Sequence, residues 1–566
     1  MFKLITTIYL MYKVVIDDPH YKSWTYYTVT DLQPVKLNFS PLDYKLYSND
    51  MFDIIDGEPV IVHSLVKEFE QTAGILSLQK TFGRQGKKFF YQCIPNDKRL
   101  PHALVPYSAK NNFNKKKVDQ YVLFKYTTWD EKHPHGSLLE VLGNVNDLPN
   151  YYNYLLYCKN LNISLKSFNT DTNVALKKKK SEQIILDICK ERQIENRTHH
   201  TIFTIDSDSC SDYDDAVGYR NNILSVYISN VPLWIECLNL WRSFTKRVST
   251  IYLPDKKRPM LPTILSDCLC SLQEKQPRIA FTMDIHLEND GNVKDVGFCN
   301  TLIKVHKNHI YESNELLDSY EYKSVFSMVK MLSETRPFIH HISNSYDLIS
   351  YLAICMNYES SKYLLTQQTG IFRQVIQKDV DDIPKHISDN ARMFFCSFHN
   401  SRAQYTMHNE AIYQSLMHKN IDSYLHITSP IRRLVDLLNM LKIQIQLGLA
   451  CFGEDANDFY TIWINDLDYI NKSMRAIRKV QNKCEILDLC DKDETQLTKT
   501  HTGYLFDKVQ SSGGLYQYNV FLQDIRLVTR ISILENYENY SEHEFKLFIF
   551  LDESRCKKKI RLQIQI

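Results

Sequence analysis

Residues 201–219 read T-I-F-T-I-D-S-D-S-C-S-D-Y-D-D-A-V-G-Y, an acidic loop between two apolar segments. The apolar run 201–205 predicts a buried strand that ends at Asp206, and 216–219 leads into the next apolar segment. Five carboxylates fall within this short stretch: Asp206, Asp208, Asp212, Asp214 and Asp215. Because like charges this close repel each other, a fold needs a reason to keep them together. A divalent metal site is one such reason, since Mg²⁺ prefers carboxylate oxygens.

Three other interpretations compete with a metal site. An EF-hand that starts at Asp206 requires glycine at its sixth position and glutamate at its twelfth, where this chain has Ser211 and Val217. A phosphorylated patch at Ser207, Ser209 or Ser211 stays open from the loop alone. A solvated acidic loop is the commoner case for an Asp-rich run, although such loops seldom join two apolar segments directly.

Length and composition restrict the class of protein. A chain of 566 residues predicts several domains, and 44% hydrophobic with 24% charged residues is typical of a globular protein. The formal net charge of +2 excludes a global basic field, so a polyanionic partner must be held by local patches. Fourteen scattered cysteines without a C-x-x-C pair favour a reducing, intracellular compartment, cytoplasmic or nuclear. No apolar run is long enough to predict a membrane span, and the N-terminus reads as a first strand rather than a signal peptide.

The N-terminal third reads as short strands separated by Asp, Asn, Pro and Gly. We expect a first cold-shock-like β-barrel, whole or partial, in 1–70 and a second one in 71–165. Residues 80–117 hold ten Lys or Arg against one acid, Asp97, with aromatic residues between them. Basic charge beside exposed rings is the combination that OB-type barrels use for single strands, which makes Lys87 and Lys88 candidate RNA contacts. The alternative is that the rings belong to the core and the lysines only solvate a surface.

The rest of the chain predicts a linker, a mixed region and a second β-rich end. The polar stretch 168–182, with its Lys177–Lys180 run, predicts an interdomain loop inside a linker at 166–200. Strands follow, with a hairpin at N-D-G-N 289–292, and then helices from about 343 to 495. Strand-like runs return in 500–566. The expected fold class is α+β and multidomain.

The spacing T-I-D-x5-D-x-D-D-A at 204–216 resembles the signature of the ribonuclease II (RNB) family of 3′→5′ exoribonucleases. Four further segments resemble that family in the same order: T-I-Y-L-P-D-K-K-R-P-M-L-P at 250–262 with S-D-C-L-C-S-L at 266–272, I-Y-E-S at 310–313, S-R-A-Q-Y-T at 401–406, and Y-L-H-I-T-S-P-I-R-R-L-V-D-L-L-N at 424–439. Residues 129–148 are similar to the end of the second cold-shock barrel in the eukaryotic exosome-associated branch. That branch carries a PIN domain, for which we expect no room here.

The resemblance implies an RNB catalytic domain at 201–495 and an OB-like RNA-binding domain at 500–566. It implies that Asp206, Asp212 and Asp215 serve one or two Mg²⁺ ions, and that Asp214, Arg432 and Arg433 are catalytic. It further implies RNA contacts by Tyr252, Tyr311, Thr428 and Ser429, whereas Asp208 has no counterpart. Single-stranded RNA is the expected partner, with no membrane, and protein partners in an RNA-degradation complex are left open.

The chain also departs from the family pattern. A glycine-rich segment is replaced by I-Y-Q-S-L-M-H-K at 412–419, and a family tyrosine is Leu434. A second stacking phenylalanine has no clear counterpart, although it should lie near 370–374. The expected function is Mg²⁺-dependent 3′→5′ hydrolysis of single-stranded RNA to nucleoside 5′-monophosphates. Two alternatives stay open: a catalytically weak or inactive RNA-binding or regulatory protein, and a carboxylate-metal nuclease that acts on DNA.

Overall fold

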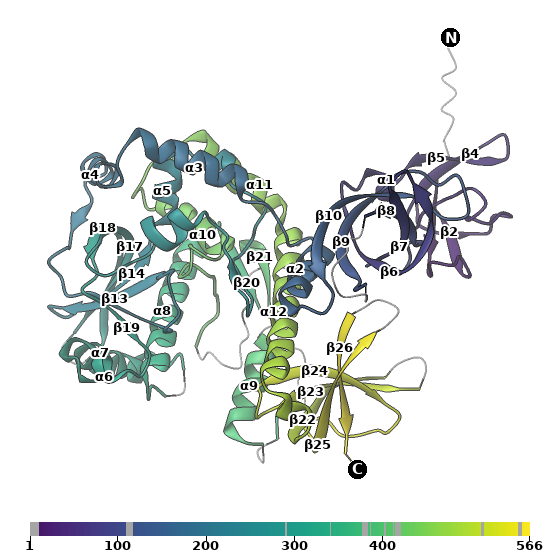
Figure 1. Ribbon diagram of the computed structural model, residues 1–566. Helices are drawn as coiled ribbons and strands as arrows, with labels where there is room; N and C mark the ends of the chain where they lie inside the picture. The colour runs from purple at the N-terminus through teal and green to yellow at the C-terminus, as the bar shows by residue number, and fades with distance from the viewer. Residues whose placement is uncertain are drawn as a thin grey trace, which may run out of the picture.

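Small antiparallel sheets occupy both ends of the chain, and a larger mixed sheet lies between them in the sequence (Figure 1). The computed structural model describes residues 11–108, 117–288, 291–339, 341–375, 383–384, 387–400, 403–410, 413, 420–510, 514–552 and 557–565. This arrangement confirms the expected α+β multidomain class. The limits assigned to the individual domains stay predictions.

Two five-stranded antiparallel sheets form the N-terminal part. The first has the order β3-β2-β1-β4-β5 and the second β10-β9-β6-β7-β8. An isolated bridge from Leu104 to His135, just before β10, brings the two ends of the second sheet together as in a barrel. Side chains of both sheets share one apolar core, which includes Val14, Phe52 and Phe124. The strands, with the short helix α1 (Leu65–Glu68), are β1 (Tyr12–Ile16), β2 (Trp24–Thr28), β3 (Pro34–Val35), β4 (Met51–Ile55), β5 (Glu58–His63), β6 (Thr72–Gln85), β7 (Lys88–Pro95), β8 (Ala103–Tyr107), β9 (Gln120–Tyr126) and β10 (Gly136–Asn144).

Three helices connect the second sheet to the central region: α2 (Leu148–Cys158), α3 (Lys166–Lys178) and α4 (Ser181–Glu191). The interdomain loop expected at 168–182 is therefore wrong, because α3 covers most of it. Phe168 and Thr172 are buried four residues apart on one face of α3, and Phe168 packs on Phe244. Two buried positions at helical spacing hold an otherwise polar helix in place.

The central sheet is mixed and has the order β11-β18-β17-β14-β13-β12-β19. Most neighbours are antiparallel, but β12 pairs parallel to β19 and β11 parallel to β18. The β17–β18 pair confirms the hairpin expected around 289–292, whose residues 289 and 290 lie outside the described chain. The strands are β11 (Glu195–Asn196), β12 (Phe203–Asp206), β13 (Asp215–Arg220), β14 (Ile223–Ser229), β17 (Pro277–Leu287), β18 (Val293–Lys304) and β19 (Lys307–Ile310).

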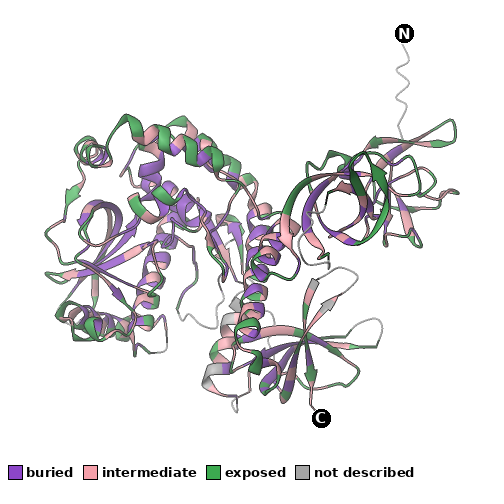
Figure 2. Ribbon diagram, viewed as in Figure 1, coloured by how far each residue is buried: buried purple, intermediate pink, exposed green. Residues whose placement is uncertain are grey.

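Helices and short ribbons surround this sheet. The buried residues gather along the central sheet and on α10 (Figure 2). Gln444 of α10 accepts hydrogen bonds from Asn230 and Asn300, which ties this helix to the sheet. The remaining elements are α5 (Val231–Cys237), η1 (Trp241–Ser243), β15 (Ile251–Tyr252), β16 (Lys257–Arg258), the π-helix η2 (Ile264–Leu269), α6 (Asn314–Asp318), α7 (Tyr320–Thr335), α8 (Ser345–Thr366), β20 (Ile371–Gln374), α9 (Asp389–Asn400), β21 (Gln404–Met407), η3 (His408–Glu410), α10 (Leu434–Gln446), α11 (Glu454–Asn465), α12 (Leu467–Lys492) and η4 (Glu494–Leu497).

The long helix α12 stands between the central sheet and the two terminal β regions (Figure 1). Lys483 of α12 donates a 2.6 Å hydrogen bond to the Tyr151 hydroxyl of α2, so this helix is joined to the N-terminal part. The C-terminal sheet has the order β24-β23-β22-β25-β26, and α9 packs on it through Phe394, whose ring stacks on Phe521 at 3.6 Å. Its strands are β22 (Thr500–Gln510), β23 (Tyr516–Leu522), β24 (Leu527–Ile533), β25 (Glu542–Asp552) and β26 (Lys557–Ile564). Within the described residues, no helix is long and apolar enough to cross a membrane.

Candidate active site

The acidic loop connects β12 to β13 at one edge of their pairing. Asp206 is the last residue of β12 and Asp215 the first of β13. The two strands pair antiparallel through Phe203 and Val217, so the end of β12 at Asp206 lies beside the start of β13 at Asp215. Burial of 203–205 and 216–218 fixes this geometry, because their apolar side chains pack into the core. The local pattern read from the sequence, strand then acidic loop then strand, is therefore confirmed.

A cavity of about 620 Å³ opens at this edge. It gathers seven of the residues named from the sequence: Asp206, Asp212, Asp214, Asp215, Tyr252, Tyr311 and Arg432. Asp208 is exposed and is not among the lining residues. Segments more than two hundred residues apart in the chain thus meet in one cavity.

Asp214 is held by Arg432. Arg432 Nε donates to Asp214 Oδ2 at 2.9 Å, and the backbone N–H of Ile431 donates to Asp214 Oδ1 at the same distance. Asp214 is only 2% exposed, and burial raises its pKa to about 7 against the opposing effect of Arg432. The Arg432 side chain is 45% exposed, so the guanidinium is anchored on one side and open to the cavity on the other.

The backbone of Arg432 is fixed by the segment that precedes Tyr252. The Thr250 N–H and the Ser249 hydroxyl both donate to the Arg432 carbonyl, at 2.9 and 2.8 Å. Arg432 Nη2 also donates to Ser429 Oγ at 3.1 Å. The arginine and the tyrosine therefore enter the cavity from two strands of backbone that are hydrogen-bonded to each other.

Asp212 faces two different partners. The Tyr252 hydroxyl donates to its Oδ2 at 2.8 Å, and Lys257 Nζ donates to its Oδ1 at 3.1 Å. Asp212 is only 8% exposed, so this pairing compensates a charge that burial would otherwise destabilise.

Asp206 and Asp215 are compensated more weakly. Arg432 acts on both at longer range, against the rise in pKa that burial causes, and the Cys210 thiol donates to Asp206 Oδ1 at 3.6 Å. In the described part of the chain neither carboxylate forms an ion pair with a lysine, arginine or histidine, unlike Asp212 and Asp214. Burial raises the pKa of both, and a neighbouring carboxylate adds to this: Asp214 for Asp206, and Asp206 for Asp215. Two adjacent, half-buried carboxylates without an ion-pair partner among the described residues are the donor set that a hard divalent ion requires.

The number of donors suits Mg²⁺ in particular. No group of three or more His, Cys, Asp or Glu among the described residues is arranged to hold a metal by itself. Mg²⁺ is commonly bound by one or two carboxylates, with water and substrate phosphate oxygens completing its shell. Asp206 and Asp215 fit this ion, whereas Asp212 already has Lys257 and Tyr252 as partners.

Tyr311 lines the opposite side of the acidic pair. Its backbone N–H donates to the Asp206 carbonyl at 3.0 Å, and its ring stacks on Tyr346 with centroids 4.0 Å apart. Burial and the two nearby carboxylates raise the pKa of Tyr311, so the phenol stays neutral.

The structure places the other predicted residues outside the cavity. Arg433 donates to Asp436 at 2.8 Å, and Thr428 and Ser429 are buried beneath Arg432. Lys87 and Lys88 are exposed at the β6–β7 hairpin, in a different sheet, and their RNA contacts stay predictions. Of the aromatic residues near them, Tyr91 belongs to the core, whereas Phe82 and Phe89 are 41% and 44% exposed. Lys110, Phe113, Lys115 and Lys116 of the basic span lie outside the described residues.

The second stacking phenylalanine, which the sequence could not place, is not supplied by the segment 370–374, because Phe372 is fully buried in the core. Its strand β20 pairs antiparallel with β21. Ser401 and Arg402, and most of 412–419, lie outside the described residues.

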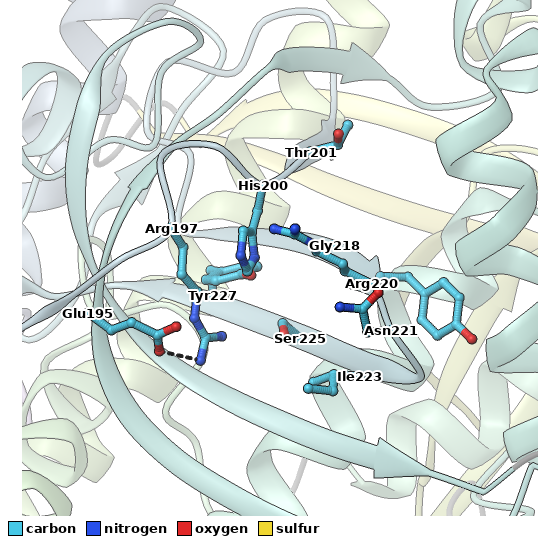
Figure 3. A pocket seen from close by; sticks show the side chains of 11 residues that line it. Glu195, Arg197, His200, Thr201, Gly218, Arg220, Asn221, Ile223, Ser225 and Tyr227 are labelled. Atoms are coloured by element: carbon cyan, nitrogen blue, oxygen red, sulfur yellow. Dashed lines mark hydrogen bonds and ion pairs between the residues drawn. The ribbon is translucent and has the colours of Figure 1, made fainter.

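A second cavity of about 140 Å³ lies at the other end of β13 (Figure 3). Arg197 dominates it, but both of its terminal nitrogens donate to Asp284, at 2.8 and 2.7 Å, and one also donates to Glu195. Ser225 donates to Asp284 as well, at 2.6 Å. The two terminal nitrogens of Arg197 are thus bound by carboxylates of the protein itself.

Sequence reasoning missed Lys257, a residue of the acidic cavity, and Asp267, which binds it from outside the lining. Lys257 donates to Asp267 at 2.9 Å as well as to Asp212. Both residues stand inside segments that resemble the RNB pattern, at 250–262 and 266–272. The signal available was a lysine and an aspartate beside two characteristic segments, but no spacing rule links them to the acidic loop.

Comparison with known proteins agrees with this architecture. The RNB domain matches residues 194–335, and the Dis3-like cold-shock domain 2 (CSD2) matches residues 90–160. Ribonuclease R of Aquifex aeolicus is 28% identical over 228 residues, which cover 38% of this chain and 30% of that protein. DIS3-like exonuclease 2 of Schizosaccharomyces pombe is 33% identical over 232 residues, which cover 37% of this chain and 24% of that protein. The matched part thus spans less than a third of either relative.

Solved structures share the fold over nearly the whole chain. Mycoplasma genitalium RNase R in complex with ribose methylated single-stranded RNA has a TM-score of 0.69 and 17% identity, covering 98% of this chain and all of that chain. Yeast Ssd1, a pseudonuclease, has a TM-score of 0.57 and 14% identity, covering 96% of this chain and 80% of that one. The likeness to these structures concerns the fold alone.

Fold and site together define a multidomain protein in which terminal β-barrels accompany a mixed-sheet domain with a carboxylate cavity. The sequence matches identify that domain as an RNB domain. This match over residues 194–335 confirms the resemblance to the RNB family that the motifs predicted.

Proposed function

We propose that this chain is a Mg²⁺-dependent exoribonuclease that shortens single-stranded RNA from its 3′ end and releases nucleoside 5′-monophosphates. The observation that carries the proposal is the meeting of two unpaired carboxylates, Asp206 and Asp215, with the open guanidinium of Arg432 in one cavity. Negative charge without a cation suits a metal, and an anchored arginine beside it suits a phosphate.

The chain's own residues have separate tasks in this proposal. Arg432 offers two donors to the non-bridging oxygens of the scissile phosphate and stabilises charge that develops there. Asp214 fixes the guanidinium through its Nε, which leaves the terminal nitrogens aimed elsewhere. Tyr252 and Tyr311 present rings on which bases can stack. A Mg²⁺ ion held by Asp206 and Asp215 would activate water and offset charge on the leaving oxygen.

The choice of RNA and of polarity rests on the relatives. Ribonuclease R and DIS3-like exonuclease 2 are ribonucleases by name, and an RNase R of the same fold has been solved with single-stranded RNA. The 3′→5′ direction follows from the family resemblance of the motifs. Hydrolysis adds water across the terminal phosphodiester, leaving a 3′-hydroxyl on the shortened strand and a 5′-phosphate on the released nucleoside.

The test compares three substrates and three proteins. RNA labelled at its 5′ end, DNA of the same sequence and an RNA hairpin are incubated with Mg²⁺ and with wild type, Asp214→Asn or Asp208→Asn. We expect a ladder of 3′-shortened RNA from wild type and from Asp208→Asn, because Asp208 is exposed and outside the cavity. Asp214→Asn should lose the ladder, since Arg432 loses its ionic anchor.

Each alternative has its own outcome. RNA bound by wild type without any shortening would support an RNA-binding protein and overturn the proposed hydrolysis. Equal cleavage of DNA would overturn the choice of substrate. Immediate release of the labelled 5′ nucleotide would mean that degradation starts at the 5′ end, which would overturn the proposed polarity.

A further inference from the structure

Lys257 is a cationic residue of the acidic cavity to which the proposed function assigns no task. Its ammonium group makes three hydrogen bonds: to Ser211 Oγ at 2.6 Å, to Asp267 Oδ1 at 2.9 Å and to Asp212 Oδ1 at 3.1 Å. The lysine lies at the start of β16, which pairs with β15, and Tyr252 is its partner residue in that pairing. Lys257 and Tyr252 are therefore neighbours through the backbone and through Asp212.

These contacts form one continuous row. Asp267 on the π-helix η2 holds Lys257, Lys257 holds one oxygen of Asp212, and the other oxygen of Asp212 accepts from the Tyr252 hydroxyl. Asp212 is buried, whereas the Tyr252 side chain is 37% exposed at the rim of the cavity. The row thus runs from a fixed helix to a ring that is partly open to solvent.

The charge of Lys257 decides which way Asp212 faces. A carboxylate as buried as Asp212 requires a cation or several donors. Lys257 supplies that cation at one oxygen of Asp212, while the other oxygen accepts from the Tyr252 hydroxyl. Lys257 therefore keeps Asp212 turned toward Tyr252.

We propose that Lys257 is a positioning residue, which acts through Asp212 to fix the Tyr252 ring at the rim of the cavity and so strengthens the stacking of a substrate base. The proposal rests on the proposed function for its substrate, single-stranded RNA. It assigns Lys257 no direct contact with the phosphate backbone.

A binding experiment tests this without hydrolysis. Full-length protein and a fluorescent single-stranded RNA are titrated in EDTA, and affinity is measured by anisotropy for wild type, Lys257→Met, Tyr252→Phe and the double variant. Tyr252→Phe keeps the ring but removes the hydroxyl that Asp212 holds. We expect each single variant to weaken binding about fivefold to tenfold, the lower end of what one base stack contributes, because the ring itself is kept. The double variant should be no weaker than either single one, because both break the same row.

Two controls separate positioning from simple charge. Lys256 is the adjacent lysine, its side chain is exposed, and Lys256→Met should leave the affinity within twofold of wild type. A lysine that touched a phosphate would contribute about 0.7 to the slope of log affinity against log salt, so Lys257→Met should leave that slope unchanged. Losses that add in the double variant, a lower salt slope, or an equal effect of Lys256→Met would each overturn the proposal.

A further variant covers the case in which Lys257→Met does not fold. Asp267→Asn removes the charge of the carboxylate that holds Lys257. It should lower the affinity for RNA by a smaller fold-change than Lys257→Met. In a protein that already carries Tyr252→Phe, it should cause no further loss. An unchanged affinity in folded Asp267→Asn and Lys257→Gln proteins would overturn the proposal. Because binding is read in EDTA, a wild type that fails to hydrolyse RNA would count against the proposed function and not against this role of Lys257.

Discussion

The two ends of strand β13 bury charge in opposite ways. At its Arg220 end, Arg197 is bound to Glu195 (Figure 3) and to Asp284, which also accepts from Ser225. At its Asp215 end, the carboxylates of Asp206 and Asp215 lie close together, and in the described part of the chain neither forms an ion pair. A buried charge costs several kcal/mol unless it is paired. Only the charges at the Arg220 end are therefore stabilised by partners within the protein. The difference indicates that the Arg220 end serves the fold and that the Asp215 end is built for something the chain does not supply.

Asp215→Asn is the variant from which we expect the largest effect, and it tests whether the Asp215 end of β13 is functional. The variant removes half of the unpaired carboxylate pair, and we expect RNA hydrolysis to fall by about a thousandfold or more, because electrostatic groups in a site typically contribute 10²–10³ each and a metal adds to that. The same variant should unfold at a higher temperature in EDTA, since it removes a like-charge contact with Asp206. Single-turnover assays and thermal unfolding measure the two effects. Retained activity together with lower stability would mean that Asp215 is structural.

Arg197→Met makes the reverse change at the other end of the strand. It leaves Asp284 buried without its cation, and we expect the free energy of unfolding to fall by about 3–5 kcal/mol, the cost of breaking a buried pair. Although burial alone would raise it, the pKa of Asp284 is lowered by the hydrogen bonds from Arg197 and Ser225, and this advantage is lost. Denaturant unfolding gives the stability, and active-site titration corrects the activity for folded protein. A loss of turnover per folded molecule as large as that of Asp215→Asn would erase the distinction between the two ends.

Arg432→Lys sharpens the comparison inside the acidic cavity. The lysine keeps the charge beside Asp214 but cannot present the planar pair of donors, so we expect turnover to fall about a hundredfold with RNA affinity changed less. Arg433→Lys is the matched variant, because Arg433 is occupied by Asp436 rather than open to the cavity. It should affect stability more than turnover. If Arg433→Lys lost as much turnover per folded molecule, the catalytic role that the sequence assigned to Arg433 would stand.

The pH dependence of stability gives a smaller effect with a defined sign. Burial raises the pKa of Asp214 to about 7 and raises that of Asp206 and Asp215 as well. A carboxyl whose pKa is higher in the folded state than in the unfolded state stabilises the fold below its unfolded pKa, and this stabilisation is lost as pH rises through the folded value. In EDTA, the melting temperature should therefore fall between about pH 4 and 7, by about one degree per kcal/mol for a chain of this size. Mg²⁺ should flatten the fall, and a profile that rises over this range would contradict the assignment.

The sequence alone was sufficient for the parts of the site that are local. Thr204–Asp215 encodes its own geometry, because buried residues on either side force Asp206 and Asp215 to the same edge. The contact between Asp214 and Arg432 spans 218 residues, and only the resemblance of two motifs connected them. No local rule could supply Lys257, since its partners Asp212 and Asp267 come from different segments and meet only after folding.

The errors have physical causes of the same kind. The polar stretch 168–182 forms helix α3 because Phe168 packs on Phe244, a residue more than seventy positions away. The stacking phenylalanine that the sequence could not place near 370–374 is not Phe372, because that ring is fully buried in the core. In both cases contacts between segments far apart in the sequence determine the structure, and local composition does not reveal such contacts.

Lys87 and Lys88 provide the weakest contrast with the paired charges of the Arg220 end. Both are exposed at the β6–β7 hairpin beside Phe89, and neither forms an ion pair in the described part of the chain. If they track an RNA backbone, the Lys87→Ala, Lys88→Ala double variant should reduce the slope of log affinity against log salt by about 1.4, and affinity severalfold at moderate salt. Lys177→Ala with Lys178→Ala, on the polar helix α3, is the matched pair and should change neither. An unchanged slope would mean that Lys87 and Lys88 are only solvated surface residues. Unpaired charge would then indicate a functional site in this protein only where the charge is also withdrawn from solvent.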